Sequence, residues 1–174
     1  SKIPRCLRRG DSIFITAVKQ IIMIEDLTYS KVNFIEVGLD SYYADCEFVS
    51  CNFSELEFGK IVFERCIFRQ CNLSLCRMSV TSWMDVRFID CKMTGIEFTN
   101  CNNFTLSVSF FKCNLQYSLF IGNNLKRAKF ISCQLQGVDF TESDLKEAVF
   151  EESDLTTSTF QSTNLEKADL SGAY

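Results

Sequence analysis

Large apolar residues recur at every fifth position along most of the chain, a period that neither an α-helix nor a β-strand produces. One run of these positions, which we call centres, extends from Tyr43 to Phe98, and a second extends from Phe110 to Leu170. A repeat that covers most of a chain determines its fold, so the period of five is the first feature to explain. A weaker run precedes both and consists of Ile24, Tyr29, Phe34 and Leu39.

A second restricted position lies two residues before each centre. The side chain there is usually small, as at Ala148 and Ser153, or a thiol, as at Cys113. The residue between the two positions is mostly polar, as at Asp144 and Asp154. Side chains that alternate within a short extended piece point to opposite faces. We therefore predict that the centre and the residue two before it point inward, and that a corner follows each piece.

The cysteines mark a longer period of twenty residues, which is interrupted once by two additional residues at Asn102–Asn103. Four pieces of five residues per turn predict a square coil. Coils stacked at the strand spacing of about 4.8 Å then predict an all-β solenoid of roughly seven coils. The cysteines on this period are Cys51, Cys71, Cys91, Cys113 and Cys133.

The chain has 174 residues, enough for a single domain, and we assign residues 1–23 to an N-terminal capping segment and residues 24–174 to the repeat. The apolar stretch Ile13–Ile24 fits either a short helix or a strand of an incomplete coil, and we favour the coil. Lys19 and Gln20 interrupt this stretch, which argues against a signal peptide, and no segment approaches the length of a transmembrane helix. A cytoplasmic protein with reduced thiols is therefore expected.

The repeats resemble the consensus A(D/N)LXX of the pentapeptide-repeat proteins over residues 24–170. The fold of that family is a right-handed quadrilateral β-helix, and the resemblance implies the same fold here. The clearest matches are Cys113-Asn114-Leu115, Ser143-Asp144-Leu145, Ser153-Asp154-Leu155, Thr163-Asn164-Leu165 and Ala168-Asp169-Leu170.

Repeats rich in Cys and Phe, at residues 63–75 and 86–98, are similar to those of the Qnr-type branch of this family. That branch contains quinolone-resistance and topoisomerase-poison immunity proteins, which bind DNA gyrase or topoisomerase IV and are described as mimics of duplex DNA. The resemblance implies a non-enzymatic protein with a type II topoisomerase as its partner and an antibiotic-resistance role, without direct contact to nucleic acid or membrane.

Two features depart from the Qnr pattern. Qnr proteins of Gram-negative bacteria carry longer projecting loops than the insertion at Asn102–Asn103. Members of the branch also usually continue into a C-terminal cap that forms a dimer, whereas this sequence stops at Tyr174, just after the last repeat. A homodimer is therefore expected if a C-terminal cap exists.

Cysteine is abundant, with ten residues, but the chain contains no histidine. Structural zinc sites usually contain closely spaced thiolates, often together with histidine, and the sequence has no C-x-x-C pair. Nucleophilic catalysis of the Ser-His-Asp or Cys-His kind needs histidine. Parallel side chains on adjacent coils are poorly placed for a disulfide. We interpret the cysteines as small buried apolar residues, and expect no metal, no cofactor, no catalytic residue and no enzymatic activity.

The net charge of −4 is spread unevenly, since residues 138–174 carry nine acidic and two basic residues. Such an acidic region would attract a cationic DNA-binding groove. Residues 60–137, with ten basic and four acidic residues, argue against a uniformly negative mimic and favour the alternative of a structural or adaptor solenoid with another protein partner. The acidic residues could also be ordinary solvated surface. The candidate partner-binding residues are Asp139, Glu142, Asp144, Glu147, Glu151, Glu152 and Asp154.

Overall fold

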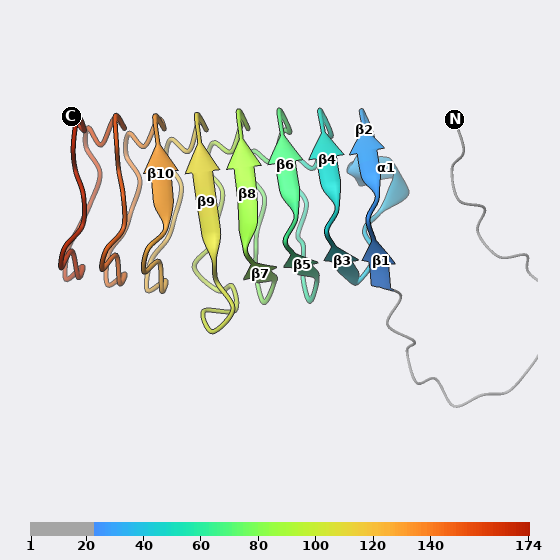
Figure 1. Ribbon diagram of the computed structural model, residues 1–174, viewed down its shortest axis with the longest axis horizontal. Coiled ribbons are helices and arrows are strands. Elements are labelled where there is room, and N and C mark those ends of the chain that lie inside the picture. Colours follow the sequence, from blue (N-terminus) through green and yellow to red (C-terminus); the bar gives the residue numbers. More distant parts are fainter. Residues whose placement is uncertain (1–22) are drawn as a thin grey trace, which may run out of the picture.

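The computed structural model, which describes residues 23–174, winds into a coil whose successive turns stack along one axis (Figure 1). The strands form two parallel sheets, with the orders β1-β3-β5-β7 and β10-β9-β8-β6-β4-β2. The coil of about twenty residues is confirmed, because Phe48 pairs with Phe68 and Phe68 with Phe88. The elements are β1 (Met23–Glu25), β2 (Thr28–Ser30), α1 (Phe34–Val37), β3 (Tyr42–Ala44), β4 (Glu47–Val49), β5 (Val62–Glu64), β6 (Ile67–Arg69), β7 (Ser82–Met84), β8 (Val86–Ile89), β9 (Val108–Phe111) and β10 (Lys129–Ile131).

Four faces run along the coil, and we number them in chain order. Face 1 carries the four-stranded sheet and face 2 the six-stranded sheet. Faces 3 and 4 carry ladders of single parallel bridges, from residue 33 to residue 154 and from residue 57 to residue 159. After β7, face 1 resumes as a bridge ladder from residue 124 to residue 164. The prediction of an all-β, right-handed quadrilateral β-helix is thus confirmed.

The centres fill the interior, as predicted, and their aromatic rings stack in columns. Phe110 lies between Phe88 and Phe130, with centroid distances of 5.2 and 5.1 Å and nearly parallel rings. The neighbouring column packs edge-on, since the Phe110 and Phe120 rings are 6.0 Å apart at 76°. Each such aromatic pair contributes about 0.5–1.5 kcal/mol beyond the burial of its area. These columns therefore add stabilising contacts to the backbone ladders that join successive coils.

The small inward position bonds one coil to the preceding one. The Cys71 thiol donates to the carbonyl oxygen of Phe48 (3.3 Å), and the hydroxyl of Ser153 donates to that of Phe130 (2.8 Å). Thiols and hydroxyls thus perform the same task at this position, which explains why Cys, Ser and Thr alternate there. The nine cysteines among the described residues are all buried and free.

The corners place ordinary residues in the left-handed region of backbone conformation. Arg65, Gln70 and Lys112, for example, have φ angles of 50°, 53° and 54°. A non-glycine residue there costs on the order of 1–2 kcal/mol, which the surrounding structure must offset. The offset comes from the ladder, since the Lys112 amide donates to the carbonyl oxygen of Ile131 at 2.9 Å.

The first coil departs from the pattern after the Asn33 bridge on face 3, where α1 takes the place of the corner found in later coils. Phe34 of α1 is nevertheless buried and stacks on Phe53 with a centroid distance of 4.5 Å. Ile24, Tyr29 and Leu39 are partly buried against the same core, so the weaker run also supplies centres. The capping segment predicted for residues 1–23 lies outside the described residues, apart from Met23.

Candidate protein-interaction surfaces

The candidate acidic residues form a ring around the coil rather than a patch on one face. The bridge ladders place them on different faces. Asp139 pairs with Thr159 on face 4, and Asp144 pairs with Asn164 on face 1. Asp154 pairs with Gln134 on face 3. Each five-residue repeat turns the chain by one side, so residues close in sequence lie on different sides. Asp139 and Glu142 belong to face 4 and its corner, Asp144 and Glu147 to face 1, Glu151 and Glu152 to face 2, and Asp154 to face 3.

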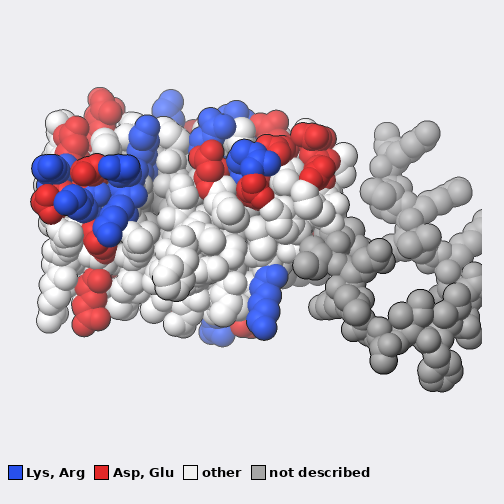
Figure 2. Space-filling model, turned by 60° about the horizontal axis from the view of Figure 1, so that its bottom comes forward, with Lys and Arg blue, Asp and Glu red and all other residues white. Residues whose placement is uncertain are grey.

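Two of these carboxylates are paired with cations of the preceding coil. Asp144 lies 3.1 Å from the Lys126 ammonium, and Glu147 lies 2.8 Å from the Arg127 guanidinium. The hydrogen bond from Arg127 lowers the pKa of the Glu147 carboxyl. Figure 2, which brings the lower side of Figure 1 forward, accordingly shows acidic and basic side chains intermixed. Unbalanced negative charge is therefore not concentrated on face 1.

The remaining candidates differ in how they are bound. Asp154 accepts hydrogen bonds from the Thr156 amide and hydroxyl, which lower its pKa. Glu152 accepts one from the Ser132 hydroxyl at 3.2 Å. Among residues 23–174, Glu142, Glu151 and Glu152 form no ion pair. Asp139 and Asp154 form none there either, so five of the seven carboxylates carry the free negative charge of the ring.

A projecting loop interrupts the coil between β8 and β9, at the insertion found in the sequence (Figure 1). Phe104 in this loop is 102% exposed. The loop is anchored to the following coil. The Asn103 side-chain oxygen accepts hydrogen bonds from the side-chain amide of Asn123 (3.0 Å) and the backbone amide of Asn124 (3.2 Å). The Asn102 side-chain oxygen accepts from the Phe104 amide at 3.2 Å. An aromatic ring is thus presented to solvent on an anchored turn.

A shallow hollow lies beside this loop and has a mixed lining. Met84 and Leu106 supply apolar surface next to Phe104, while Arg65 supplies a cation and Glu64 and Asp85 supply carboxylates. The Arg65 guanidinium is held by Asp45 in the preceding coil, at 2.7 Å. The hollow and the loop together offer an apolar contact bordered by fixed charges, which is the composition expected of a protein contact.

Two long stretches of the sequence match a known protein family. The profile of the family described as "Pentapeptide repeat region" matches residues 41–107 and 103–170. The chain belongs to the pentapeptide-repeat family.

Solved structures resemble this pentapeptide-repeat protein in fold. Two trypsin-treated variants of QnrB1, described as a plasmid-mediated fluoroquinolone resistance protein, match with TM-scores of 0.59 and 0.53. Their identities are 16% and 18%, and the matches cover 87% and 88% of this chain and 81% and 83% of the QnrB1 chains. At such identities the likeness shows the fold alone. A search of curated proteins finds no match.

Metal sites and membrane spans are absent from the described part of this pentapeptide-repeat protein. Within residues 23–174, no group of three or more Cys, Asp or Glu side chains is placed to hold a metal ion. No helix of the same part of the chain has the length and apolar character needed to cross a membrane.

The ion pairs and the exposed ring were not predicted from the sequence, although the sequence holds a signal for the first. Lys126 and Asp144 nearly match the twenty-residue period, and Arg127 and Glu147 match it fully. Sorting charges by their position within this period would have found the Arg127–Glu147 pair. The outward direction of the Phe104 side chain could not be predicted in this way, because a residue in an insertion has no fixed position within the five-residue repeat.

Proposed function

We propose that this pentapeptide-repeat protein is a non-enzymatic, cytoplasmic binding protein that engages a type II topoisomerase and protects it from quinolones or toxins. The observation that carries the binding role is the anchored loop that presents Phe104 fully to solvent. The likeness of its fold to QnrB1, described as a fluoroquinolone resistance protein, supports the choice of partner. DNA gyrase and topoisomerase IV are the candidates, with a homodimer as the binding form if a C-terminal cap exists.

Phe104 is suited to anchor such a contact. Aromatic side chains dominate binding energy when a partner pocket encloses them fully. The hydrogen bonds of Asn102 and Asn103 fix the loop before binding, so less conformational entropy is lost when the complex forms. Arg65 beside it is already paired with Asp45 and Glu64. Asp85 adds a further carboxylate to the hollow, so the local charge would favour a partner with basic groups.

Mimicry of DNA would depend on fewer carboxylates than the composition suggests. Asp144 and Glu147 are balanced by cations within 3.1 Å, so their field is weak at the distance of an approaching partner. The five carboxylates without an ion pair in the described part of the chain would supply the free negative charge toward a cationic groove, namely Asp139, Glu142, Glu151, Glu152 and Asp154. Because they occupy different faces, only some of them can contact one partner surface.

The test is supercoiling by purified DNA gyrase in the presence of ciprofloxacin. The protein is expected to restore supercoiling, and Phe104→Ser is expected to reduce this protection about tenfold, because an aromatic anchor is lost. Tyr117→Ser is the matched control, since Tyr117 is also aromatic and 67% exposed but lies on another side of the coil. Absence of both protection and inhibition at micromolar protein would overturn the topoisomerase assignment.

The alternative function is an adaptor solenoid with a different protein partner, and the pairing of Asp144 and Glu147 with cations favours it. A pull-down with wild-type protein and with a Glu151→Lys, Glu152→Lys variant separates the two. Recovery of a partner other than a topoisomerase, unaffected by the charge reversal, would support the adaptor. Recovery of gyrase that is lost on charge reversal would exclude it.

A further inference from the structure

Face 2 carries a stripe of apolar side chains on its outer surface. The last residues of β8, β9 and β10 are Ile89, Phe111 and Ile131, which are direct neighbours in the sheet. All three are half-buried and alternate with fully buried centres, so they point outward. Three successive rungs of the sheet thus present a continuous apolar row to solvent.

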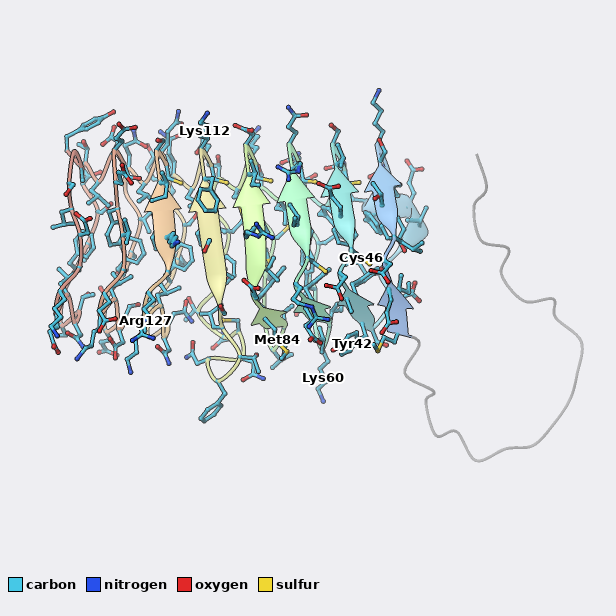
Figure 3. The ribbon with its side chains drawn as sticks, viewed as in Figure 1. Tyr42, Cys46, Lys60, Met84, Lys112 and Arg127 are labelled. Atoms are coloured by element: carbon cyan, nitrogen blue, oxygen red, sulfur yellow. The ribbon has the colours of Figure 1, made fainter. Side chains whose placement is uncertain are left out.

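Three cations border this stripe. Arg87 and Lys129 are exposed and lie on either side of Ser109 in the neighbouring row of the same sheet. Lys112 follows β9 at the corner, where it lies at the edge of the sheet (Figure 3). Among the described residues none of the three cations forms an ion pair.

Several other cations of the described coil are neutralised by ion pairs, and what sets these three apart is that they gather, unpaired, around one apolar stripe. On the same face the Arg69 guanidinium lies 2.6 Å from the Glu47 carboxylate. Two carboxylates stand at the border of the stripe: Asp90 follows Ile89, and Glu151 belongs to the coil beyond β10. The surface therefore consists of a central apolar row with three cations beside it and one carboxylate near each end.

We propose that this surface, formed by Ile89, Phe111, Ile131, Arg87, Lys112 and Lys129, binds an acidic amphipathic helix of a partner protein. Rungs of the sheet are about 4.8 Å apart, so the three apolar side chains span about 10 Å. Residues i, i+4 and i+7 of an α-helix span about 10.5 Å along its axis and form one apolar row. A helix parallel to the coil axis would place its apolar row on the stripe and carboxylates beside the cations.

Other occupants fit the surface less well. An extended peptide along the coil axis repeats its side chains on one face at about 6.6–6.8 Å, which does not match the rungs. Single-stranded nucleic acid is bound by aromatic stacking along a basic groove, whereas two of the three stripe residues are isoleucine. The spacing and the charge together favour the acidic helix.

The experiment measures fluorescence anisotropy of a labelled, about eighteen-residue helical peptide with leucines in one row and glutamates on both flanks. Wild-type protein is expected to bind it, and added salt is expected to weaken the binding. One double variant combines Phe111→Thr with Ile131→Thr, and a second combines Arg87→Glu with Lys129→Glu. Each is expected to bind the peptide at least about tenfold more weakly than the wild type. Threonine suits an outward strand position, so the first variant preserves the sheet.

Matched controls come from the same molecule. Val49→Thr changes an outward apolar residue on β4, outside the stripe, and Lys60→Glu reverses an exposed cation outside face 2; both are expected to bind as wild type. If the apolar variant fails to melt like the wild type, the charge variant carries the test. Phe104→Ser is expected to leave peptide binding unchanged, which separates this proposal from the topoisomerase assignment.

Several outcomes would overturn the proposal. These are no binding by wild-type protein, equal binding of a scrambled peptide of the same composition, and equal binding by the stripe variants. Binding of anionic vesicles or of single-stranded DNA that the variants lose, without binding of the peptide, would assign the surface to a membrane or a nucleic acid instead.

Discussion

Replacing Phe110 with alanine is expected to lower the free energy of unfolding by about 3–5 kcal/mol, the loss typical of a large buried aromatic residue. Phe110 is buried midway along the coil, stacked on Phe88 and Phe130 and edge-on to Phe98 and Phe120. In a solenoid each coil contacts only its neighbours, so a cavity here weakens the interfaces on both sides at once. Urea denaturation followed by far-UV circular dichroism measures the loss.

The adjacent Phe111 provides the matched control. It has the same side chain but points outward and is half-buried, so Phe111→Ala is expected to cost no more than about 1 kcal/mol. A comparable loss for Phe110→Ala and Phe111→Ala would contradict the inward assignment of the centres.

The second large effect is a steep loss of stability in alkaline solution. Burial raises the pKa of the Cys66, Cys76, Cys101 and Cys113 thiols to about 12, from an ordinary value of 9.0. The unfolded chain releases these protons above pH 9, whereas the folded chain keeps them until about pH 12. Unfolding therefore releases protons in this window, and stability falls as the pH rises. Each thiol contributes about 1.4 kcal/mol per pH unit, and a typical domain has only about 5–15 kcal/mol in total.

Circular dichroism between pH 8 and pH 12 under reducing conditions measures this transition, which is expected between about pH 10 and pH 11. A variant with Cys66→Ser, Cys76→Ser and Cys113→Ser keeps a donor at each position, as Ser153 does naturally, but removes the titrating thiols. It is expected to unfold at higher pH and less steeply. An unchanged transition in the variant would show that the thiols do not control it.

The interior of this fold could be predicted in detail because burial imposes the period. Every centre in the run from Tyr43 to Phe98 is buried, and the aromatic columns follow from the twenty-residue spacing. Inward positions tolerate only a few side chains, and this restriction is visible in one sequence. The same restriction identified the insertion at Asn102–Asn103, because the phase of the centres shifts there.

The surface could be predicted only in part, because outward positions accept many residues. Counting charge along the chain grouped Asp139 with Asp154, although a five-residue repeat turns the chain by one side and places them on different faces. The stripe of Ile89, Phe111 and Ile131 was also missed, since outward residues carry no constraint from packing in the core. Phase within the twenty-residue coil, applied to outward positions, would have recovered both.

The insertion between β8 and β9 also bears on how the chain assembles. Because successive coils present nearly the same inward pattern, a coil could align with the wrong neighbour, one rung out of phase, with little penalty in the interior. The coil that joins β8 to β9 is two residues longer than the one that joins β4 to β6, as the pairs Val86 with Val108 and Glu47 with Ile67 show. In a slipped arrangement these residues would have to be buried or would break the ladder. The loop therefore favours one register of the coils over the slipped alternatives in an otherwise repetitive chain.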